Sequence, residues 1–301
     1  MRISYLLARA LPGFLVAAVL FSGVSIVPTA SAQGASADNP QTIGQYARHF
    51  RMYRRDVDDL TELTFRDINE VNQARELVLS YDPSNLSRGW IAHQAIIASR
   101  APGFMDRVRT ASERRGQAAF FNSARTSPQY MWDLGTETAA INFVFDGLYQ
   151  DSSEATAVGE ILRDRAMLYM ETSYGGRLPR GASNSAQDIL VADNSVHRGN
   201  GRRYAIAYRS QGIMSQVLEL AARLSLDRTD GRSMRATAQL LENEETTRCV
   251  RWAQLNLNQC MAATRNQAEE AYCTGRHGVN ELSECWGWMV DLAGADHASL
   301  D

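Results

Sequence analysis

All four cysteines of the chain lie between Cys249 and Cys285, near its C-terminal end. The segment from about Met234 to Arg265 lacks glycine and proline and has recurring apolar residues, which predicts one continuous helix. Cys249 and Cys260 are eleven residues apart on that helix, a distance of roughly 16 Å, whereas the Cα atoms of a disulfide are about 5.5 Å apart. These two cysteines therefore cannot pair with each other. Because eleven residues are also about three helical turns, both sulfur atoms face the same side.

A reversal of the chain at Asn266 would bring a second helix back along the first. The pairs Cys249–Cys285 and Cys260–Cys273 are both centred on that turn. We therefore predict two nested disulfides that staple an antiparallel αα-hairpin, because the crossed pairing would need a large offset along the helix axes. Each bridge should stabilise the fold by about 3 kcal/mol.

The second helix of this hairpin needs a local break. Cys273 and Cys285 are twelve residues apart, which places them about 120° out of phase on an ideal α-helix. Gly275 and Gly278 lie between them, and a break there would restore the phase. The arrangement resembles the twin-cysteine helical hairpins of small coiled-coil-helix proteins over fewer than 40 residues, with different spacings, and this resemblance implies nothing about a site or a function.

Metal binding and redox chemistry are the alternatives for the cysteines. Zinc could be bound by Cys273, His277 and other thiols, but the sequence lacks the closely spaced C-x-x-C pairs of zinc ribbons, redox centres and haem attachment sites. His277 and Glu281 are one helical turn apart, as metal ligands can be, yet we interpret them as a surface pair. We therefore expect structural cysteines, no metal and no cofactor.

Residues 1–32 have the features of a secretory signal peptide. Arg2 and Arg9 give a positive start, the stretch 14–27 is apolar, and Ala30-Ser31-Ala32 is a typical cleavage site. No later segment approaches about 18 uninterrupted apolar residues, so we expect no transmembrane segment in the mature chain. A periplasmic or secreted location would favour disulfides, because such compartments are oxidising.

The charge of the chain excludes several classes of function. The net charge of the full chain is −3, and loss of two arginines with the signal peptide gives about −5 for the mature chain (−3 − 2). A mildly acidic chain is not typical of a general nucleic-acid binder. All 31 basic residues are arginine, so chemistry that needs a lysine, such as a Schiff base or a P-loop, is excluded.

Helical periodicity runs through most of the chain, and no segment alternates like a β-strand over a useful length. We therefore predict an all-α fold, either a multi-helix bundle or an irregular helical array, which ends in the disulfide-stapled αα-hairpin. Before the hairpin, the predicted helices are about 42–80, 84–100, 103–123, 127–149, 152–172 and 204–226. The predicted organisation is a linker at 33–41, an N-terminal helical region at 42–173, a long loop at 174–203, a C-terminal helical region at 204–292 and a tail at 293–301.

The first predicted helix, 42–80, has apolar residues at alternating spacings of three and four, including Ile43, Phe50 and Val57, with a stutter at Leu63–Phe65. This stripe could form a coiled-coil homodimer. It could instead pack along the chain's own bundle, which is the interpretation we favour.

The loop at 174–203 is the main candidate for a ligand site. It holds basic residues that could gather around a carboxylate, a phosphate or a sugar acid, namely Arg177, Arg180, His197, Arg198, Arg202 and Arg203. The last two lie near the predicted helix start at Tyr204, where free N–H groups also favour anions. The alternative is a solvated loop whose arginines face water.

Other ionisable residues give weaker indications. His93 lies in an apolar helix and is expected to be a satisfied, partly buried histidine. Asp133 and Glu137 are one turn apart in another apolar helix, but nothing assigns either of them as a general acid. The sequence contains no nucleophile-elbow, zinc-protease or dinucleotide-binding motif.

These features favour an exported helical protein that acts through protein–protein contacts in the cell envelope, as a scaffold or accessory factor. We expect a protein partner and no nucleic acid. The first alternative is a protein or enzyme that binds a small anion through the 174–203 loop. The second alternative is a self-assembling coiled-coil protein.

Overall fold

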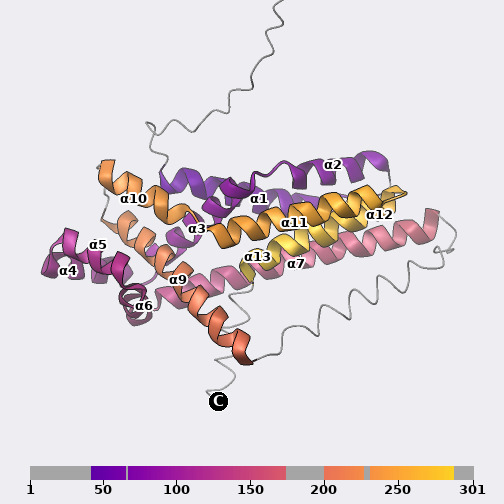
Figure 1. The fold of residues 1–301 in the computed structure, drawn as a ribbon. Coiled ribbons are helices and arrows are strands. Elements are labelled where there is room, and N and C mark those ends of the chain that lie inside the picture. Colours follow the sequence, from indigo (N-terminus) through magenta and orange to yellow (C-terminus); the bar gives the residue numbers. More distant parts are fainter. Residues whose placement is uncertain (1–41, 66, 174–199, 227–230, 288–301) are drawn as a thin grey trace, which may run out of the picture. The chain divides into compact units, whose positions relative to one another are not determined.

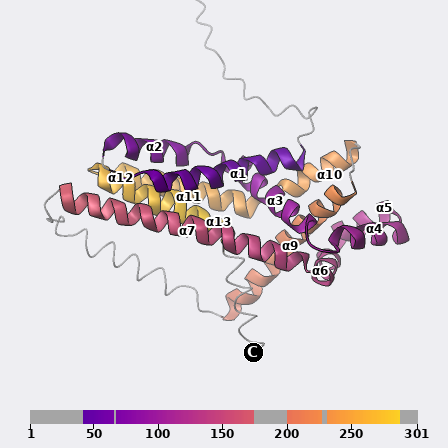
Figure 2. The same cartoon turned by 180° about the vertical axis from the view of Figure 1, so that it is seen from behind.

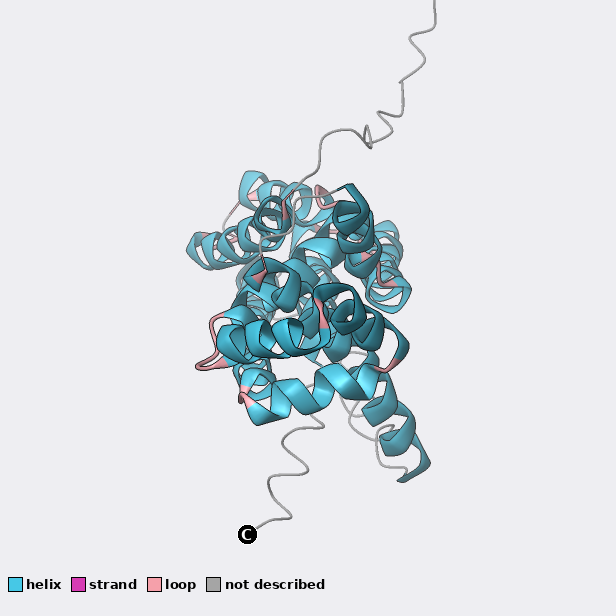
Figure 3. Ribbon diagram, turned by 90° about the vertical axis from the view of Figure 1, so that its left-hand side faces the viewer, coloured by secondary structure: helices cyan, strands magenta, loops and turns pink. Residues whose placement is uncertain are grey.

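The computed structural model of the chain describes residues 42–65, 67–173, 200–226 and 231–287, without the side chains of 173, 200–210 and 231–232. Throughout this part of the chain the regular structure is helical, with no β-strand (Figure 3). The predicted all-α fold is therefore confirmed. The predicted signal peptide, linker and tail lie outside the described residues.

The helices follow one another in the order that the sequence suggests, with more interruptions. The first half of the chain forms α1 (Ile43–Asp59), a 3₁₀-helix η1 (Leu60–Glu62), α2 (Ile68–Leu79), α3 (Pro83–Ser99), α4 (Phe104–Arg115), α5 (Gln117–Thr126), α6 (Pro128–Glu137) and α7 (Ala140–Ser173) (Figure 1). The second half forms α9 (Asn200–Ser225), α10 (Gly231–Leu241), α11 (Glu244–Ala263), α12 (Gln267–Cys273), a π-helix η2 (Thr274–Asn280) and α13 (Glu281–Gly287) (Figure 2). Helix α7 runs alongside α12, η2 and α13, whereas α4, α5 and α6 pack on one another and on α9.

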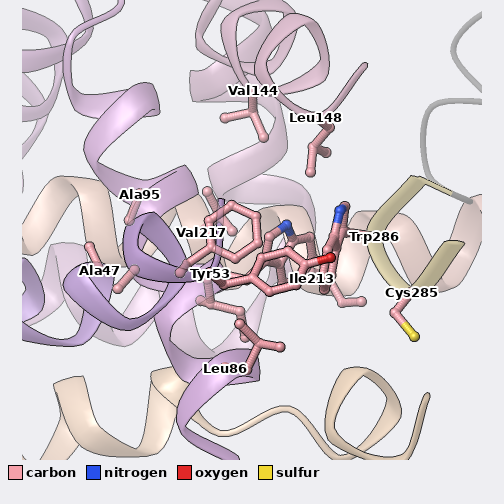
Figure 4. Close-up of a cluster of buried hydrophobic side chains, with 14 of the residues drawn as sticks. Ala47, Tyr53, Leu86, Ala95, Val144, Leu148, Ile213, Val217, Cys285 and Trp286 are labelled. Atoms are coloured by element: carbon pink, nitrogen blue, oxygen red, sulfur yellow. The ribbon is translucent and has the colours of Figure 1, made fainter. Parts of the chain in front are cut away.

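Helices from both halves of the chain share one hydrophobic core. Leu86 of α3, Val144 of α7, Ile213 of α9 and Trp286 of α13 are buried in the same cluster (Figure 4). The indole ring of Trp286 meets the ring of Tyr53 in α1 edge-on, with centroids 5.4 Å apart. The stapled hairpin is therefore part of this common core and not an appended unit.

The prediction of one continuous helix over 42–80 is wrong in the middle of this range, where the helical structure is interrupted between α1 and α2. Phe65 has a φ of 55° there, and its side chain is fully buried. Arg165 of α7 donates hydrogen bonds to the backbone oxygens of Thr61 and Leu63. The stutter therefore marks a true break, in which burial of Phe65 offsets the cost of its backbone conformation.

The apolar stripe of α1 packs inside the chain's own bundle. Ile43, Ala47, Phe50, Tyr53 and Val57 are each at most 6% exposed. A coiled-coil homodimer through this helix would need these side chains at the surface. In this structure the stripe is therefore not available to a second chain, as the bundle interpretation requires.

Residues with a positive φ divide two more of the predicted helices. Gly116, with a φ of 76°, separates α4 from α5, and Ala139, with a φ of 54°, separates α6 from α7. The expected helix start at Ser152 or Ser153 is also wrong, because both residues lie in the middle of α7. The Ser153 hydroxyl donates to a backbone oxygen of the preceding turn, so a serine that looks like an N-cap in the sequence is compatible with an uninterrupted helix.

The helix predicted from Met234 to Arg265 is divided into α10 and α11. The side-chain oxygen of Asn243 caps α11 by accepting from the backbone N–H of Thr246 at 2.9 Å. The side-chain amide of Asn243 also donates to the side-chain oxygen of Gln216 in α9 at 3.2 Å. This hydrogen bond ties the junction between α10 and α11 to α9. The first two cysteines of the hairpin remain together on α11, so the reason that they cannot pair is unchanged.

The disulfides of the hairpin are nested. Cys249 is bonded to Cys285 and Cys260 to Cys273, with Cα atoms 5.5 and 5.7 Å apart, which is the pairing that the spacing predicts. The π-helix η2 lies between Cys273 and Cys285. Its i→i+5 hydrogen bonds hold more residues per turn than those of an α-helix, so it restores the phase of these two cysteines. The break predicted near the glycines is therefore a π-helix.

The close approach of η2 to α7 depends on a pair of glycines. A Cβ atom on Gly275 would lie 2.9 Å from the backbone oxygen of Gly159 and 3.1 Å from the Cβ of Leu162. We expect Gly275→Ala to lower the free energy of unfolding by about 2 kcal/mol, because a backbone atom cannot move aside cheaply. Gly212→Ala in α9, where a Cβ would meet nothing within 4 Å, should instead raise it by up to about 1 kcal/mol. Urea unfolding followed by circular dichroism measures both, and equal effects would contradict the packing argument.

Candidate functional site

The structure leaves the predicted loop site undecided. Arg177, Arg180, His197 and Arg198 lie outside the described residues. The backbone of Arg202 and Arg203 is in the first turn of α9, which begins at Asn200 and not at Tyr204 as expected. The side chains of both arginines are outside the described part, so the anion site in the loop stays a prediction.

His277 and Glu281 form a contact, but their place differs from the surface pair that we predicted. Nδ1 of His277 lies 2.8 Å from a carboxylate oxygen of Glu281, and the side chains are only 22% and 16% exposed. The second oxygen of Glu281 accepts from the amide of Asn256 on α11 at 2.9 Å. The pair therefore ties the two sides of the hairpin together. Within the described residues, no three His, Cys, Asp or Glu side chains are placed to hold a metal ion.

Asp151 of α7 lies at the centre of a buried group of polar side chains, which we call the Asp151 cluster. Its side chain is 2% exposed, and one carboxylate oxygen accepts from the Arg54 guanidinium at 2.8 Å. The other oxygen accepts from the amide of Gln94 at 3.1 Å and lies 4.0 Å from Nε2 of His93. Arg54 also pairs with Glu154 at 2.6 Å. The cluster therefore joins α1, α3 and α7 through charged groups.

Burial shifts the pKa values of two groups in the Asp151 cluster in opposite directions. It raises the pKa of Asp151 to about 6, although Arg54 and the hydrogen bond from Gln94 act to lower this pKa. It lowers the pKa of His93 to about 4, helped by the charges of Arg54, Arg51 and Arg100. At neutral pH Asp151 is therefore ionised and His93 is neutral, so their contact is not an ion pair.

Several polar atoms around the Asp151 cluster are buried without a hydrogen-bond partner among the residues that the structure describes. They are the Tyr53 hydroxyl, Nδ1 of His93, Oε1 of Gln94 and Nε1 of Trp286. Phe50 contacts three of these residues, with ring centroids 5.9 Å from Tyr53, 5.4 Å from His93 and 5.2 Å from Trp286. Buried polar groups nearly always have hydrogen-bond partners. An ordered internal water needs two to four polar partners, and these buried atoms are groups of the kind that such a water binds. Within the described residues Nδ1 of His93 has no partner, so the protein alone does not satisfy this histidine.

The two shifted groups have opposite effects on stability as the pH changes. The pKa of Asp151 is raised from 3.8 by folding, so its contribution is fully present below about pH 4 and is lost as the pH rises through 6. The pKa of His93 is lowered from 6.5, so its contribution is present above pH 6.5 and is lost as the pH falls through 4. Between these limits the two contributions offset each other.

Single substitutions should reveal each contribution. When the pH falls from 7 to 4.5, the free energy of unfolding of Asp151→Asn should change by about 2 kcal/mol less favourably than that of the wild-type chain, because only the His93 contribution remains. For His93→Gln the same change should be about 2 kcal/mol more favourable than in the wild type, because only the Asp151 contribution remains. Urea unfolding at the two pH values gives both differences. Parallel pH profiles for the wild type and the two variants would contradict the assigned pKa shifts.

A surface cleft of about 290 Å³ lies between α4 and α6. Arg107, Arg114 and Arg115 line it from α4, and Asp133 and Glu137 line it from α6. The two carboxylates that the sequence places one turn apart therefore face three arginines. One of the three arginines forms an ion pair within the cleft, because Arg107 pairs with Glu137.

The outer surface of α11 exposes an aromatic and an aliphatic side chain one turn apart. Trp252 is 63% exposed and Leu255 is 44% exposed. Arg248 and Arg251 are exposed on the same helix, and the segment 248–263 contains no acidic residue. We call these four residues the α11 face.

No protein family, curated protein or solved structure matches the chain. Among the helices of the described ranges, none is both long and apolar enough to cross a lipid bilayer.

Proposed function

We propose that the mature chain is an exported accessory or scaffold protein, periplasmic or secreted, that acts through contact with a protein partner in the cell envelope. The signal-like N-terminus and the two disulfides support export, since disulfides persist in oxidising compartments. The observation that supports a protein partner is the α11 face, with its exposed Trp252.

The composition of the α11 face is that of an interaction site. Tryptophan and arginine are enriched among the residues that dominate binding energy at protein interfaces. Trp252 and Leu255 offer adjacent apolar area, and Arg248 and Arg251 add positive charge, while the acidic residues of α11 are confined to its first turn, at Glu244 and Glu245. The partner that fits is a protein surface with an apolar centre and an acidic rim.

The disulfides give the α11 face a rigid support. Cys249 and Cys260 hold α11 to α13 and α12, and they lie within one turn and about two turns of Trp252. A face that is ordered before binding loses less conformational entropy when a partner docks. This role connects the hairpin, which two disulfides constrain, with the proposed contact.

The test compares two exposed aromatic residues of equal accessibility. Trp252 on α11 and Tyr149 on α7 are both 63% exposed. Full-length mature chain, Trp252→Ala/Leu255→Ser and Tyr149→Ala are immobilised, and proteins retained from an envelope extract of the chain's own host are quantified by mass spectrometry. We expect an acidic protein to be retained by the wild type and by Tyr149→Ala, and to be depleted at least about tenfold with the α11 variant.

Two outcomes would overturn this proposal. One is that the same proteins are retained by all three forms, and the other is that nothing is retained above a blank surface. Light scattering on the purified chain distinguishes a second copy from a different partner. A dimer that Trp252→Ala dissociates would mean that the α11 face binds another copy of this chain.

A further inference from the structure

We propose that the cleft between α4 and α6 is a binding site for a small monocarboxylate with an apolar or aromatic body. This site is separate from the α11 face and from the loop that the sequence indicates, and it does not depend on the proposed function. Its volume of about 290 Å³ is close to the lower limit for pockets that enclose small organic molecules.

The charges in the cleft are only partly matched by the protein itself. Arg107 is paired with Glu137. Arg115 lies over the ring of Tyr130, 4.9 Å from its centroid, and touches the Ser123 hydroxyl at 3.5 Å. In the described part of the chain, no side chain forms an ion pair or a hydrogen bond with Arg114. One guanidinium that lines the cleft is therefore free to bind an anion, and its neighbour is held only by weak contacts.

The guanidinium group selects for carboxylates. Its planar donors match the two oxygens of a carboxylate, and such charge-assisted pairs are the stronger hydrogen bonds of proteins. Arg114 and Arg115 are consecutive residues at the end of α4, and both line the cleft. Arginines at a helix C-terminus also interact favourably with the helix dipole. This interaction explains their position on α4, but it does not explain the apolar groups that line the cleft beside them.

The remaining lining residues define the body of the ligand. Ala111 of α4 and Tyr130 and Leu134 of α6 supply apolar and aromatic surface between the charged residues. In the described part of the chain the Asp133 carboxylate has no cationic partner, since its contact is a hydrogen bond of 2.5 Å from the neutral amide of Gln129. This carboxylate disfavours dianions such as phosphate, so the cleft fits a single negative charge attached to an apolar group.

Benzoate is a suitable probe because it joins one carboxylate to one aromatic ring. We expect it to shift the amide NMR signals of Thr110 and Ala111 in the full-length mature chain in a saturable manner. Arg114→Gln/Arg115→Gln should weaken benzoate binding at least about tenfold, the effect of losing about 1.4 kcal/mol. Asp133→Asn should tighten it about threefold, because a repelling charge is removed.

A matched control separates site binding from general attraction to arginine. Arg109 is on the same helix, outside the cleft, and lies 3.3 Å from Asp106. Arg109→Gln should leave the affinity for benzoate unchanged. The proposal is overturned if benzoate causes no saturable shifts, if Arg109→Gln weakens binding as much as the cleft variant does, or if inorganic phosphate binds more tightly than benzoate.

Discussion

Arg54→Met should lower the free energy of unfolding by about 3 kcal/mol at pH 7.5 and by clearly less at pH 5. The substitution leaves the Asp151 carboxylate 2% exposed and without its guanidinium partner, and an uncompensated buried charge is strongly destabilising. Arg54 lowers the pKa of Asp151, so its loss moves that pKa above its present value of about 6. A carboxyl whose folded pKa is raised destabilises the fold as the pH rises through that pKa, so the penalty is largest at neutral and alkaline pH.

Two further variants make this prediction specific. Arg54→Met/Asp151→Asn removes both charges and should recover most of the loss, because the Asp151 cluster then holds no buried ion. Arg55→Met, at the next position, is the matched control, since Arg55 is 68% exposed and its contact with Asp56 is a surface pair of 3.2 Å. It should cost less than about 0.5 kcal/mol. Equal losses for Arg54→Met and Arg55→Met at pH 7.5 would show that the Asp151 cluster does not stabilise the core through charge.

The hairpin could be predicted from the sequence because the information that defines it is local. Cys249 and Cys260 on one helix, and a turn at Asn266, are enough to exclude one pairing and to favour the nested one. Even the mismatch between Cys273 and Cys285 pointed to an irregular segment in the correct place. A requirement of register between covalently linked residues constrains the backbone more strongly than helical propensity does.

The Asp151 cluster could not be predicted, because its members come from distant parts of the chain. Gln94 is 57 residues from Asp151 in sequence, and Arg54 is 100 residues from its second partner, Glu154. Each of these residues alone looks like an ordinary polar position on an amphipathic helix. A signal for Asp151 did exist, since an acidic residue between Leu148 and Ala155 falls on the buried side of α7.

Two of the helix breaks, at Phe65 and Ala139, were missed for a related reason. Phe65 and Ala139 adopt positive φ values although neither is glycine, so the sequence gives no turn residue at these positions. At Phe65 the break is favoured by a buried ring and by hydrogen bonds from Arg165 to Thr61 and Leu63, which are more than one hundred residues from it. Tertiary contacts of this kind override a continuous helical pattern.

Removal of the outer disulfide should cost more than removal of the inner one. Cys249–Cys285 closes a sequence separation of 36 residues and Cys260–Cys273 closes one of 13. In the chain-entropy description the longer loop restricts the unfolded chain more, which gives about 4 kcal/mol for the outer bridge and about 3 kcal/mol for the inner one. Urea unfolding of Cys249→Ala/Cys285→Ala and of Cys260→Ala/Cys273→Ala, without reductant, measures the two losses.

Reduction of the wild-type chain is the control for effects of the substitutions themselves. Dithiothreitol should lower the urea midpoint of the wild type below that of either double variant, since it opens both loops at once. Cys285 is fully buried and Cys273 is 3% exposed, whereas Cys249 and Cys260 are only partly buried, so we expect dithiothreitol to attack each bridge at its α11 sulfur. A larger loss for the inner bridge, or a midpoint that dithiothreitol leaves unchanged, would contradict the role of the bridges as nested staples. The outer bridge lies within one turn of Trp252, so its loss should weaken the proposed partner binding more than loss of the inner bridge.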